Sequence, residues 1–317
     1  MAGPQCCSNP PTLDPSAGAG HVVHLGGLST YVAGSPESKL AVLFLSDIFG
    51  YEAPNLRKIA DEAAAAGFYA VLPDFMHGEP FALDKPDRPL PVWLKDHSTV
   101  GQAILTRPAN PTRTRHEVNS FISLFTSRLH SLHFTGLFLV FPLLFLCGQT
   151  TPRPAVGDGR NHPHGLWEWF RPHLFGDKGF EEAKTIIEAI KSQGVSAVGA
   201  VGYCWGGKVV AELSKHEQLI KAGVSLHPAW ATVDDIKEAK VPTAILGAEI
   251  DDFAPPELLK QFEEILNAKP GVDSYVKVFP KTEHGWTIRY NVEDEGAVKS
   301  AKEASQILLD WCVKYVK

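Results

Sequence analysis

The sequence predicts an α/β fold in which a mostly parallel central sheet is flanked by helices on both faces. Short, continuously apolar runs alternate with segments that have helical spacing, and this alternation is typical of a parallel sheet covered on both sides. The chain has 317 residues, of which 44% are hydrophobic and 21% charged. This length is sufficient to bury a substantial core in one large domain.

The elements of the first part of the chain follow from local patterns. Residues 21–32 (HVVHLGGLSTYV) predict a short hairpin, and the apolar run Leu40–Leu45 predicts a buried parallel strand. Residues 54–66 have the spacing of an amphipathic helix, and Gly67 is a good residue to end it. Residues 69–72 predict the next strand, which ends before Pro73.

The alternation of expected strands and helices resumes in the second part of the chain. We expect strands at 195–203, 221–226, 243–246 and 274–279, and helices at 180–193, 208–215, 256–268 and 297–316. Ligands of such sheets bind at the carboxyl ends of the strands. Functional residues are therefore expected directly after these strands.

Two segments do not follow this alternation of strands and helices. Residues 1–20 are rich in Pro, Gly and Ser and are expected to form a flexible tail, so that a single domain spans residues 21–317. Residues 98–176 have no lasting period and are expected to be a poorly ordered insertion into this domain, with a retained intron as one hypothesis for its origin. The apolar run 134–147 within it is shorter than a membrane-spanning helix requires and is interrupted by Pro142.

Composition narrows the possible partners. The net charge of −6 offers no basic patch, so nucleic acid is not an expected partner. The five cysteines show neither disulfide nor metal-ligand spacing, and the N-terminus lacks a secretory pattern. We therefore expect a cytoplasmic protein, either a monomer or a homodimer, without a membrane partner, a metal or an organic cofactor.

The most informative motif is Gly-Tyr-Cys-Trp-Gly at residues 202–206. It stands between an expected strand and an expected helix, where a sharp turn projects the central side chain above the sheet edge. The flanking Gly202 and Gly206 allow the backbones to approach closely enough for that turn. A thiol at a helix N-terminus can ionise and attack a carbonyl carbon. The alternative for Cys204 is a small buried core residue.

A cysteine nucleophile needs a base, and the base needs an orienting acid. Asp251 and Asp252 follow the expected strand 243–246, and His284 follows the expected strand 274–279. The order of nucleophile, acid and histidine, each after a separate strand, is that of the α/β-hydrolase arrangement. Because each residue follows a strand, all three are expected at the same edge of the sheet.

At these residues the chain resembles the dienelactone hydrolase (carboxymethylenebutenolidase) family of α/β-hydrolases, across about residues 22–98 and 177–317. The matching stretches are Ser46-Asp47-Ile48-Phe49-Gly50, Leu72-Pro73-Asp74-Phe75, Gly202-Tyr203-Cys204-Trp205-Gly206-Gly207, Asp251-Asp252-Phe253-Ala254-Pro255 and Glu283-His284-Gly285-Trp286. The resemblance implies a triad of Cys204, Asp251 and His284. It favours Asp251 because the family pattern places Pro four residues after the acid, and Asp252 is the alternative.

The resemblance also implies roles for the loop after strand 40–45. Backbone N–H groups of Ile48 and Trp205 would form the oxyanion hole. The family places a carboxylate in this loop that communicates with the thiol, and Asp47 holds that position here. The alternative for Asp47 is a cap or turn former.

The substrate is less closely defined by the resemblance. Bacterial relatives hold a substrate carboxylate with two arginines, but none follows Pro73-Asp74 here, and Arg289 lies about one residue from the second position. Arg289 is thus either a substrate-binding residue or a surface side chain. We expect a small ester or lactone rather than a dienelactone, with Trp205, Trp286 and Phe75 as an apolar wall.

Two other functions remain open at this stage. The insertion could make the chain an inactive or impaired form that serves as a binding or scaffold protein. A glucan hydrolase is the second alternative, because some relatives carry that name. Glycoside hydrolysis requires two carboxylates flanking the sugar, and the sequence shows no evident pair of this kind.

Overall fold

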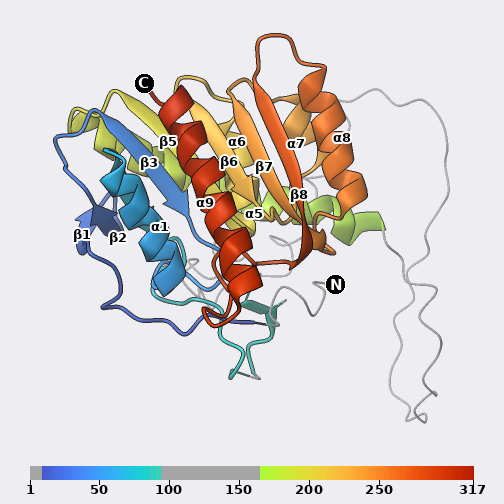
Figure 1. Ribbon diagram of the computed structural model, residues 1–317, viewed down its shortest axis with the longest axis horizontal. Coiled ribbons are helices and arrows are strands. Elements are labelled where there is room, and N and C mark those ends of the chain that lie inside the picture. Colours follow the sequence, from blue (N-terminus) through green and yellow to red (C-terminus); the bar gives the residue numbers. More distant parts are fainter. Residues whose placement is uncertain (1–8, 86, 91, 94–164) are drawn as a thin grey trace, which may run out of the picture. The chain divides into compact units, whose positions relative to one another are not determined.

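A mostly parallel eight-stranded sheet forms the centre of the protein, in the strand order β1-β2-β4-β3-β5-β6-β7-β8. The computed structural model describes residues 9–85, 87–90, 92–93 and 165–317 (Figure 1). All of these residues belong to one compact unit. The β1–β2 and β2–β4 pairs are antiparallel, and each later pair is parallel. The expected fold class is confirmed.

The bounds of the elements follow the sequence patterns closely. The strands are β1 (His21–Leu25), β2 (Leu28–Ala33), β3 (Leu40–Leu45), β4 (Tyr69–Pro73), β5 (Ala197–Tyr203), β6 (Ala222–Leu226), β7 (Thr243–Ile250) and β8 (Ser274–Glu283). The described helices are α1 (Pro54–Ala65), α5 (Gly165–Ser192), α6 (Trp205–Leu213), α7 (Val233–Lys237), α8 (Pro256–Asn267) and α9 (Glu295–Tyr315).

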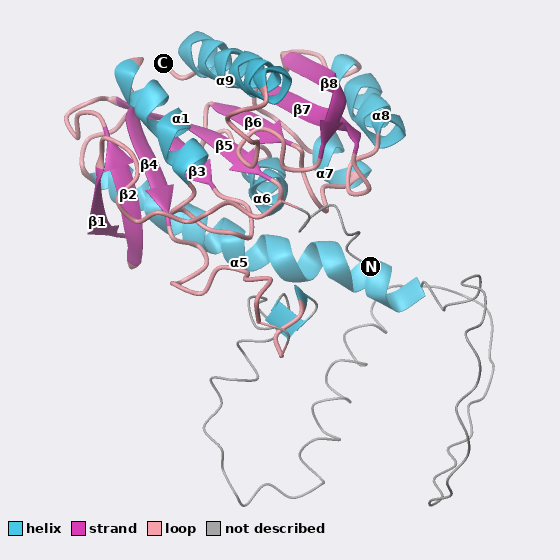
Figure 2. Ribbon diagram, turned by 60° about the horizontal axis from the view of Figure 1, so that its bottom comes forward, coloured by secondary structure: helices cyan, strands magenta, loops and turns pink. Residues whose placement is uncertain are grey.

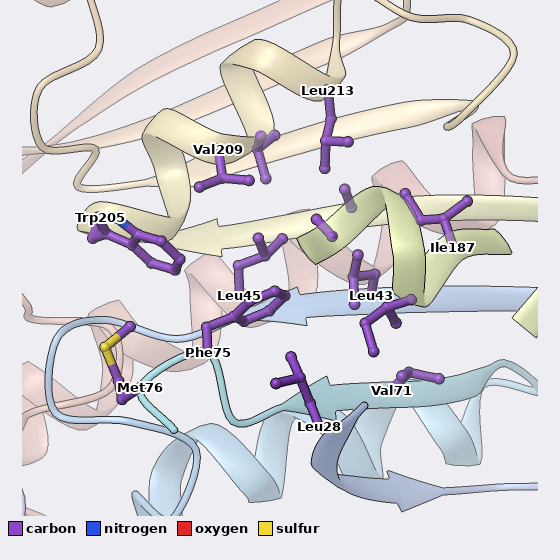
Figure 3. Close-up of a cluster of buried hydrophobic side chains, with 14 of the residues drawn as sticks. Leu28, Leu43, Leu45, Val71, Phe75, Met76, Ile187, Trp205, Val209 and Leu213 are labelled. Carbon is purple, nitrogen blue, oxygen red and sulfur yellow. The ribbon is translucent and has the colours of Figure 1, made fainter. Parts of the chain in front are cut away.

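The helices cover both faces of the sheet (Figure 2). Alternate residues of β3 point to opposite sides: Leu43 joins an apolar cluster with α5 and α6, whereas Phe44 joins a cluster with α1 and α9. Figure 3 shows the first of these clusters, in which Phe75 and Trp205 lie at the end towards the Cys204 turn. Burial on both faces explains why the strands are continuously apolar rather than alternating.

Several elements differ from expectation in extent. The strands β7 and β8 continue to Ile250 and Glu283, because their backbones stay paired beyond the apolar runs. Helix α6 begins at Trp205 rather than at residue 208, since the helix includes Gly206 and Gly207. The short helix α7 was not expected, although Thr232 and Asp235 form a capping box that marks its start.

The two segments that do not follow the alternation of strands and helices, residues 1–20 and 98–176, also differ from expectation in the parts that the structure describes. Residues 165–176 begin helix α5, so this end of the expected insertion is helical, although its sequence shows no lasting period. The remainder of the expected insertion, residues 98–164, lies outside the described residues. The apolar run 134–147 is part of that remainder.

Residues 9–20 are held against the domain and are not a free tail. The buried Arg57 of α1 donates hydrogen bonds from Nη1 to the carbonyl oxygens of Pro15 (2.7 Å) and Ala17 (3.1 Å). The amide N–H of Ala19 donates to Asp61 at 2.8 Å. Residues 1–8 lie outside the described residues. The expected flexibility therefore does not hold for residues 9–20.

A buried ionic cluster joins α6, the helix that follows Cys204, to α7. Lys208 Nζ lies 2.8 Å from Asp235 Oδ2 and also pairs with Glu212, and Lys215 lies 3.3 Å from the other oxygen of Asp235. Burial by itself raises the pKa of Asp235, but the Lys208 charge and the hydrogen bonds hold that pKa well below its usual value of 3.8. The charged form of Asp235 therefore stabilises the native state.

Replacing this carboxylate is expected to weaken the fold in a pH-dependent way. Asp235→Asn should lower the free energy of unfolding by about 3 kcal/mol near neutral pH, because it removes the more deeply buried of the two carboxylates that pair with the buried Lys208. The native pKa is depressed, so the stabilisation is complete above the unfolded pKa of about 3.9 and is lost as the pH falls towards the native pKa.

Urea unfolding at about pH 7 and about pH 3 measures this effect, with the gap between wild type and variant narrowing at the lower pH. Asp234→Asn is the matched control, because the neighbouring side chain is 86% exposed and pairs only at the surface with Lys237. Equal effects of the two substitutions would contradict the assignment.

Candidate active site

The carboxyl ends of the parallel strands bring the candidate residues to one edge of the sheet. Asp47 is the second residue after the end of β3, and Cys204 directly follows β5. Asp251 and His284 directly follow β7 and β8. Because all four strands run in the same direction, their ends share this edge, as the sequence predicted.

Cys204 occupies a strained turn between β5 and α6. Its backbone angles are φ 52° and ψ −113°, and positive φ is unfavourable for a residue with a side chain. A Cβ on Gly202 would lie 2.1 Å from the carbonyl oxygen of Gly206, and one on Gly206 would lie 2.4 Å from that of Leu45. Both glycines are therefore required by the close packing of this turn, and Cys204 itself is fully buried.

Asp251 and His284 form a buried pair. His284 Nδ1 lies 2.8 Å from Asp251 Oδ2, and both side chains are fully buried. The other oxygen, Asp251 Oδ1, accepts hydrogen bonds from the amide N–H groups of Phe253 and Ala254. The neighbouring Asp252 is exposed. Of the two aspartates, the structure thus brings Asp251 to the histidine.

The pair leaves the far nitrogen of the imidazole available. Within the described part of the chain, His284 Nε2 is buried and has no hydrogen-bond partner. A carboxylate beside Nδ1 favours the tautomer that carries a proton on Nδ1, and it orients the ring through this hydrogen bond.

Asp47 forms an ion pair with Arg289. Asp47 Oδ2 lies 3.3 Å from Arg289 Nε, and each side chain is only 1% exposed. Asp47 Oδ1 accepts a hydrogen bond from the N–H of Phe49, and the guanidinium lies over the Phe49 ring. Burial raises the pKa of Asp47, while the Arg289 charge acts in the opposite direction. Arg289 is therefore not a surface side chain.

The backbone N–H groups of Ile48 and Trp205 both lie at this edge of the sheet. Ile48 lies in the loop after β3, and Trp205 is the first residue of α6, where an N–H has no partner within the helix. Among the described residues, neither N–H donates a hydrogen bond to a protein acceptor. The role of these two groups as an oxyanion hole stays a prediction.

The expected apolar wall is divided between the two faces of the sheet. The rings of Phe75 and Trp205 pack together, with centroids 5.8 Å apart. Trp286 instead packs on Phe279, at 4.3 Å, within the cluster on the α9 side. The turn after β8 carries Trp286 to that face, which local sequence patterns do not reveal.

A cavity of about 520 Å³ lies beside the histidine loop. His284, Trp286 and Arg289 contribute to its wall, whereas Cys204 and Phe75 do not. The sequence-predicted contacts Trp286 and Arg289 thus share one cavity, and the Phe75–Trp205 pair lies elsewhere.

His227 was not anticipated by the sequence analysis. It directly follows β6, and its buried ring lies 5.0 Å from that of His284. The signal in the sequence is its position directly after an expected strand, because the candidate residues Cys204 and Asp251 follow the neighbouring strands in the same way. Whether a polar residue at such a position touches the site depends on tertiary packing.

Within the described residues, no group of three or more His, Cys, Asp or Glu side chains could hold a metal ion. The same part of the chain contains no helix that is long and apolar enough to cross a membrane.

The strand order, the cysteine at the sharp strand–helix turn and the histidine–aspartate pair at the same edge define an α/β-hydrolase. The model of the dienelactone hydrolase family matches residues 28–120 and 169–315. The chain belongs to the dienelactone hydrolase family of hydrolases.

The chain is also similar in sequence to individual named proteins. A carboxymethylenebutenolidase homologue of Xenopus tropicalis is 27% identical over 94% of this chain and 91% of its own length. A maize protein named endo-1,3;1,4-β-D-glucanase is 32% identical over 84% of this chain. The match spans 62% of the length of the maize protein.

Solved structures show the same fold. The chain resembles a dienelactone hydrolase-like promiscuous phosphotriesterase from metagenomic libraries, with a TM-score of 0.53 and 14% identity over 95% of this chain and 100% of the other. A dienelactone hydrolase structure from Klebsiella pneumoniae gives a TM-score of 0.50 at 15% identity, over 91% and 93% of the two chains.

Proposed function

We propose that the protein hydrolyses small esters or lactones through a thioester on Cys204, with His284 as base and Asp251 as orienting acid. The observation that carries the proposal is the buried Asp251–His284 pair, whose free Nε2 lies at the edge where β5 delivers Cys204. Among the described residues, the N–H groups of Ile48 and Trp205 at this edge donate to no protein acceptor, which supports a role for them in acyl transfer.

The first half-reaction forms the thioester. His284 Nε2 takes the proton from the Cys204 thiol, and the thiolate attacks the carbonyl carbon to form a C–S bond. The oxyanion then faces the N–H groups of Ile48 and Trp205, each worth about 3 kcal/mol of barrier. As the C–O bond to the leaving group breaks, His284 returns the proton to the departing oxygen.

The second half-reaction releases the acid. His284 takes a proton from water, the resulting hydroxide attacks the thioester carbonyl, and the C–S bond breaks. Asp251 stabilises the imidazolium in both halves of the cycle. The thiol is regenerated when sulfur recovers its proton from His284.

The nature of the substrate follows from the lining of the site. The Phe75–Trp205 pair gives an apolar surface beside the nucleophile turn, which favours a small apolar acyl or alcohol group. Trp286 and Arg289 are candidate contacts for the part of the substrate that enters the cavity next to His284. Asp47 balances the Arg289 charge, and a role for Asp47 in modulating the thiol is part of this proposal.

Glycan hydrolysis is the second candidate because the maize relative is named a glucanase. That chemistry needs two carboxyl groups that flank the sugar. The buried carboxylates that follow the parallel strands at this edge are already engaged: Asp47 with Arg289, Asp251 with His284, and Asp74 with the N–H groups of Met76 and Gly78. The ester or lactone reaction is therefore favoured.

A substrate panel separates these functions. We expect saturable hydrolysis of p-nitrophenyl acetate and butyrate and of a small aromatic lactone, with rates that fall as the acyl chain lengthens. Mixed-linkage β-glucan should release no reducing sugar. Release of reducing sugar without ester turnover would support glycan hydrolysis, and inactivity towards the whole panel would support a binding or scaffold protein.

A further inference from the structure

We infer that the loop after β6, residues 227–230, positions the catalytic histidine, and that His227 is its central positioning residue. This inference rests on the proposed function, because it concerns how His284 is held for proton transfer. It combines three observations: the aromatic surroundings of His284, the hydrogen bonds of His227, and the attachment of the loop to Cys204.

The imidazole of His284 lies between two other rings. His227 packs on it at 5.0 Å with an interplanar angle of 68°, and Phe253 packs on it at 5.0 Å with an angle of 49°. Trp230, from the same loop as His227, packs against Phe253 at 5.4 Å. The loop therefore supports the base directly through one residue and indirectly through another.

A hydrogen bond fixes the ring of His227. Its Nε2 lies 2.7 Å from Oγ1 of Thr287, which is buried three residues after His284. The other ring nitrogen, Nδ1, is also buried. The hydrogen bond between Nε2 and Thr287 Oγ1 therefore fixes the orientation of a ring that is closed off from solvent.

The surroundings of His227 keep its ring neutral. Burial lowers the pKa of His227 well below its usual value of 6.5, and the nearby His284 and Arg289 lower it further. His227 is thus not a second base for the reaction. The neutral ring forms the hydrogen bond with Thr287 that ties the loop after β6 to the loop that carries His284.

The same loop is attached to the nucleophile through the backbone. The N–H of Cys204 donates to the carbonyl oxygen of Leu226 at 3.1 Å, and the N–H of Ala229 donates to the carbonyl oxygen of Cys204 at 2.9 Å. His227 and Trp230 have positive φ angles of 37° and 63°. Such strain persists only where the surroundings impose it, and it gathers at functional sites. The loop therefore links the nucleophile turn to the base.

Kinetics of two substitutions at His227 test whether its hydrogen bond or only its bulk matters. His227→Gln places an amide group near the position of Nε2 and should keep kcat for p-nitrophenyl acetate within about threefold of wild type. His227→Phe keeps an aromatic ring but loses the hydrogen bond, and should lower kcat about tenfold or more with little change in KM, because the base is displaced.

Thr287→Val removes the other partner and provides the test if His227→Phe does not fold. It should match the loss of His227→Phe, and the double variant should be no slower than either single variant, because both remove one interaction. Thr243→Val is the matched control, since Thr243 is equally buried and donates one hydrogen bond to Val241 at the far end of β7.

Two outcomes would overturn the inference: His227→Phe as fast as wild type, or His227→Phe retaining more activity than His227→Gln. Alkylation of Cys204 by iodoacetamide, followed against pH, provides a readout without turnover, and its profile should shift in His227→Phe and Thr287→Val but not in Thr243→Val. Failure of the proposed function looks different, because Cys204→Ala would then be as active as wild type.

Discussion

Cys204→Ala should lower kcat/KM for p-nitrophenyl acetate by about 10⁴-fold or more, because loss of a nucleophile removes the covalent route altogether. Cys204 is the residue at the strained turn, where the chain tolerates φ 52° to present a thiol at the N-terminus of α6. The methyl group of alanine cannot form the C–S bond. Spectrophotometric assay of p-nitrophenol release measures the effect.

Cys312→Ala is the control for this substitution. Cys312 is the other free cysteine among the described residues, and it is as well buried, within α9. Burial raises the pKa of its thiol to about 12, which makes it unreactive. Cys312→Ala should keep wild-type activity even if the new cavity lowers its stability. Comparable losses in both variants would mean that the effect is structural.

Asp251→Asn should lower kcat by about 10⁴-fold with an intact fold, because the amide no longer accepts the Nδ1 proton and no longer stabilises the imidazolium. The structure supports this size of effect, since both carboxylate oxygens of Asp251 are engaged and the 2.8 Å contact with His284 is completely buried. Steady-state kinetics, with circular dichroism as a check on folding, provide the measurement.

Asp252→Asn is the adjacent control. Its side chain is exposed, and it changes the charge of the chain by the same amount as Asp251→Asn. It should leave kcat close to that of wild type. A large loss in Asp252→Asn with little effect in Asp251→Asn would transfer the orienting role to the second aspartate.

The positions of the candidate residues could be predicted from the sequence because they depend on chain direction. Apolar runs such as Leu40–Leu45 identify buried parallel strands, and parallel strands must bring the residues that follow them to one edge. The order of Cys204, Asp251 and His284 therefore carried structural information before any contact was known. The close approach of Gly202 to Gly206 likewise follows from the motif.

The partners of several side chains could not be predicted, because they depend on packing between distant segments. No local feature of the sequence around Arg289 indicates that it is buried against Asp47, which lies in the loop after the distant strand β3. Trp286 and Phe75 both flank the expected edge in sequence, yet they pack on opposite faces of the sheet. His227 gains its significance only from its contacts with His284 and Thr287.

Detection of the acyl-enzyme tests the central claim most directly. The protein is mixed with a p-nitrophenyl ester, quenched in acid during turnover, digested, and analysed by mass spectrometry. We predict one acyl group on the peptide that contains Cys204, lost on treatment with hydroxylamine as expected of a thioester, and absent from Cys204→Ala. Full ester turnover with the acyl group on a residue other than Cys204 would contradict the account.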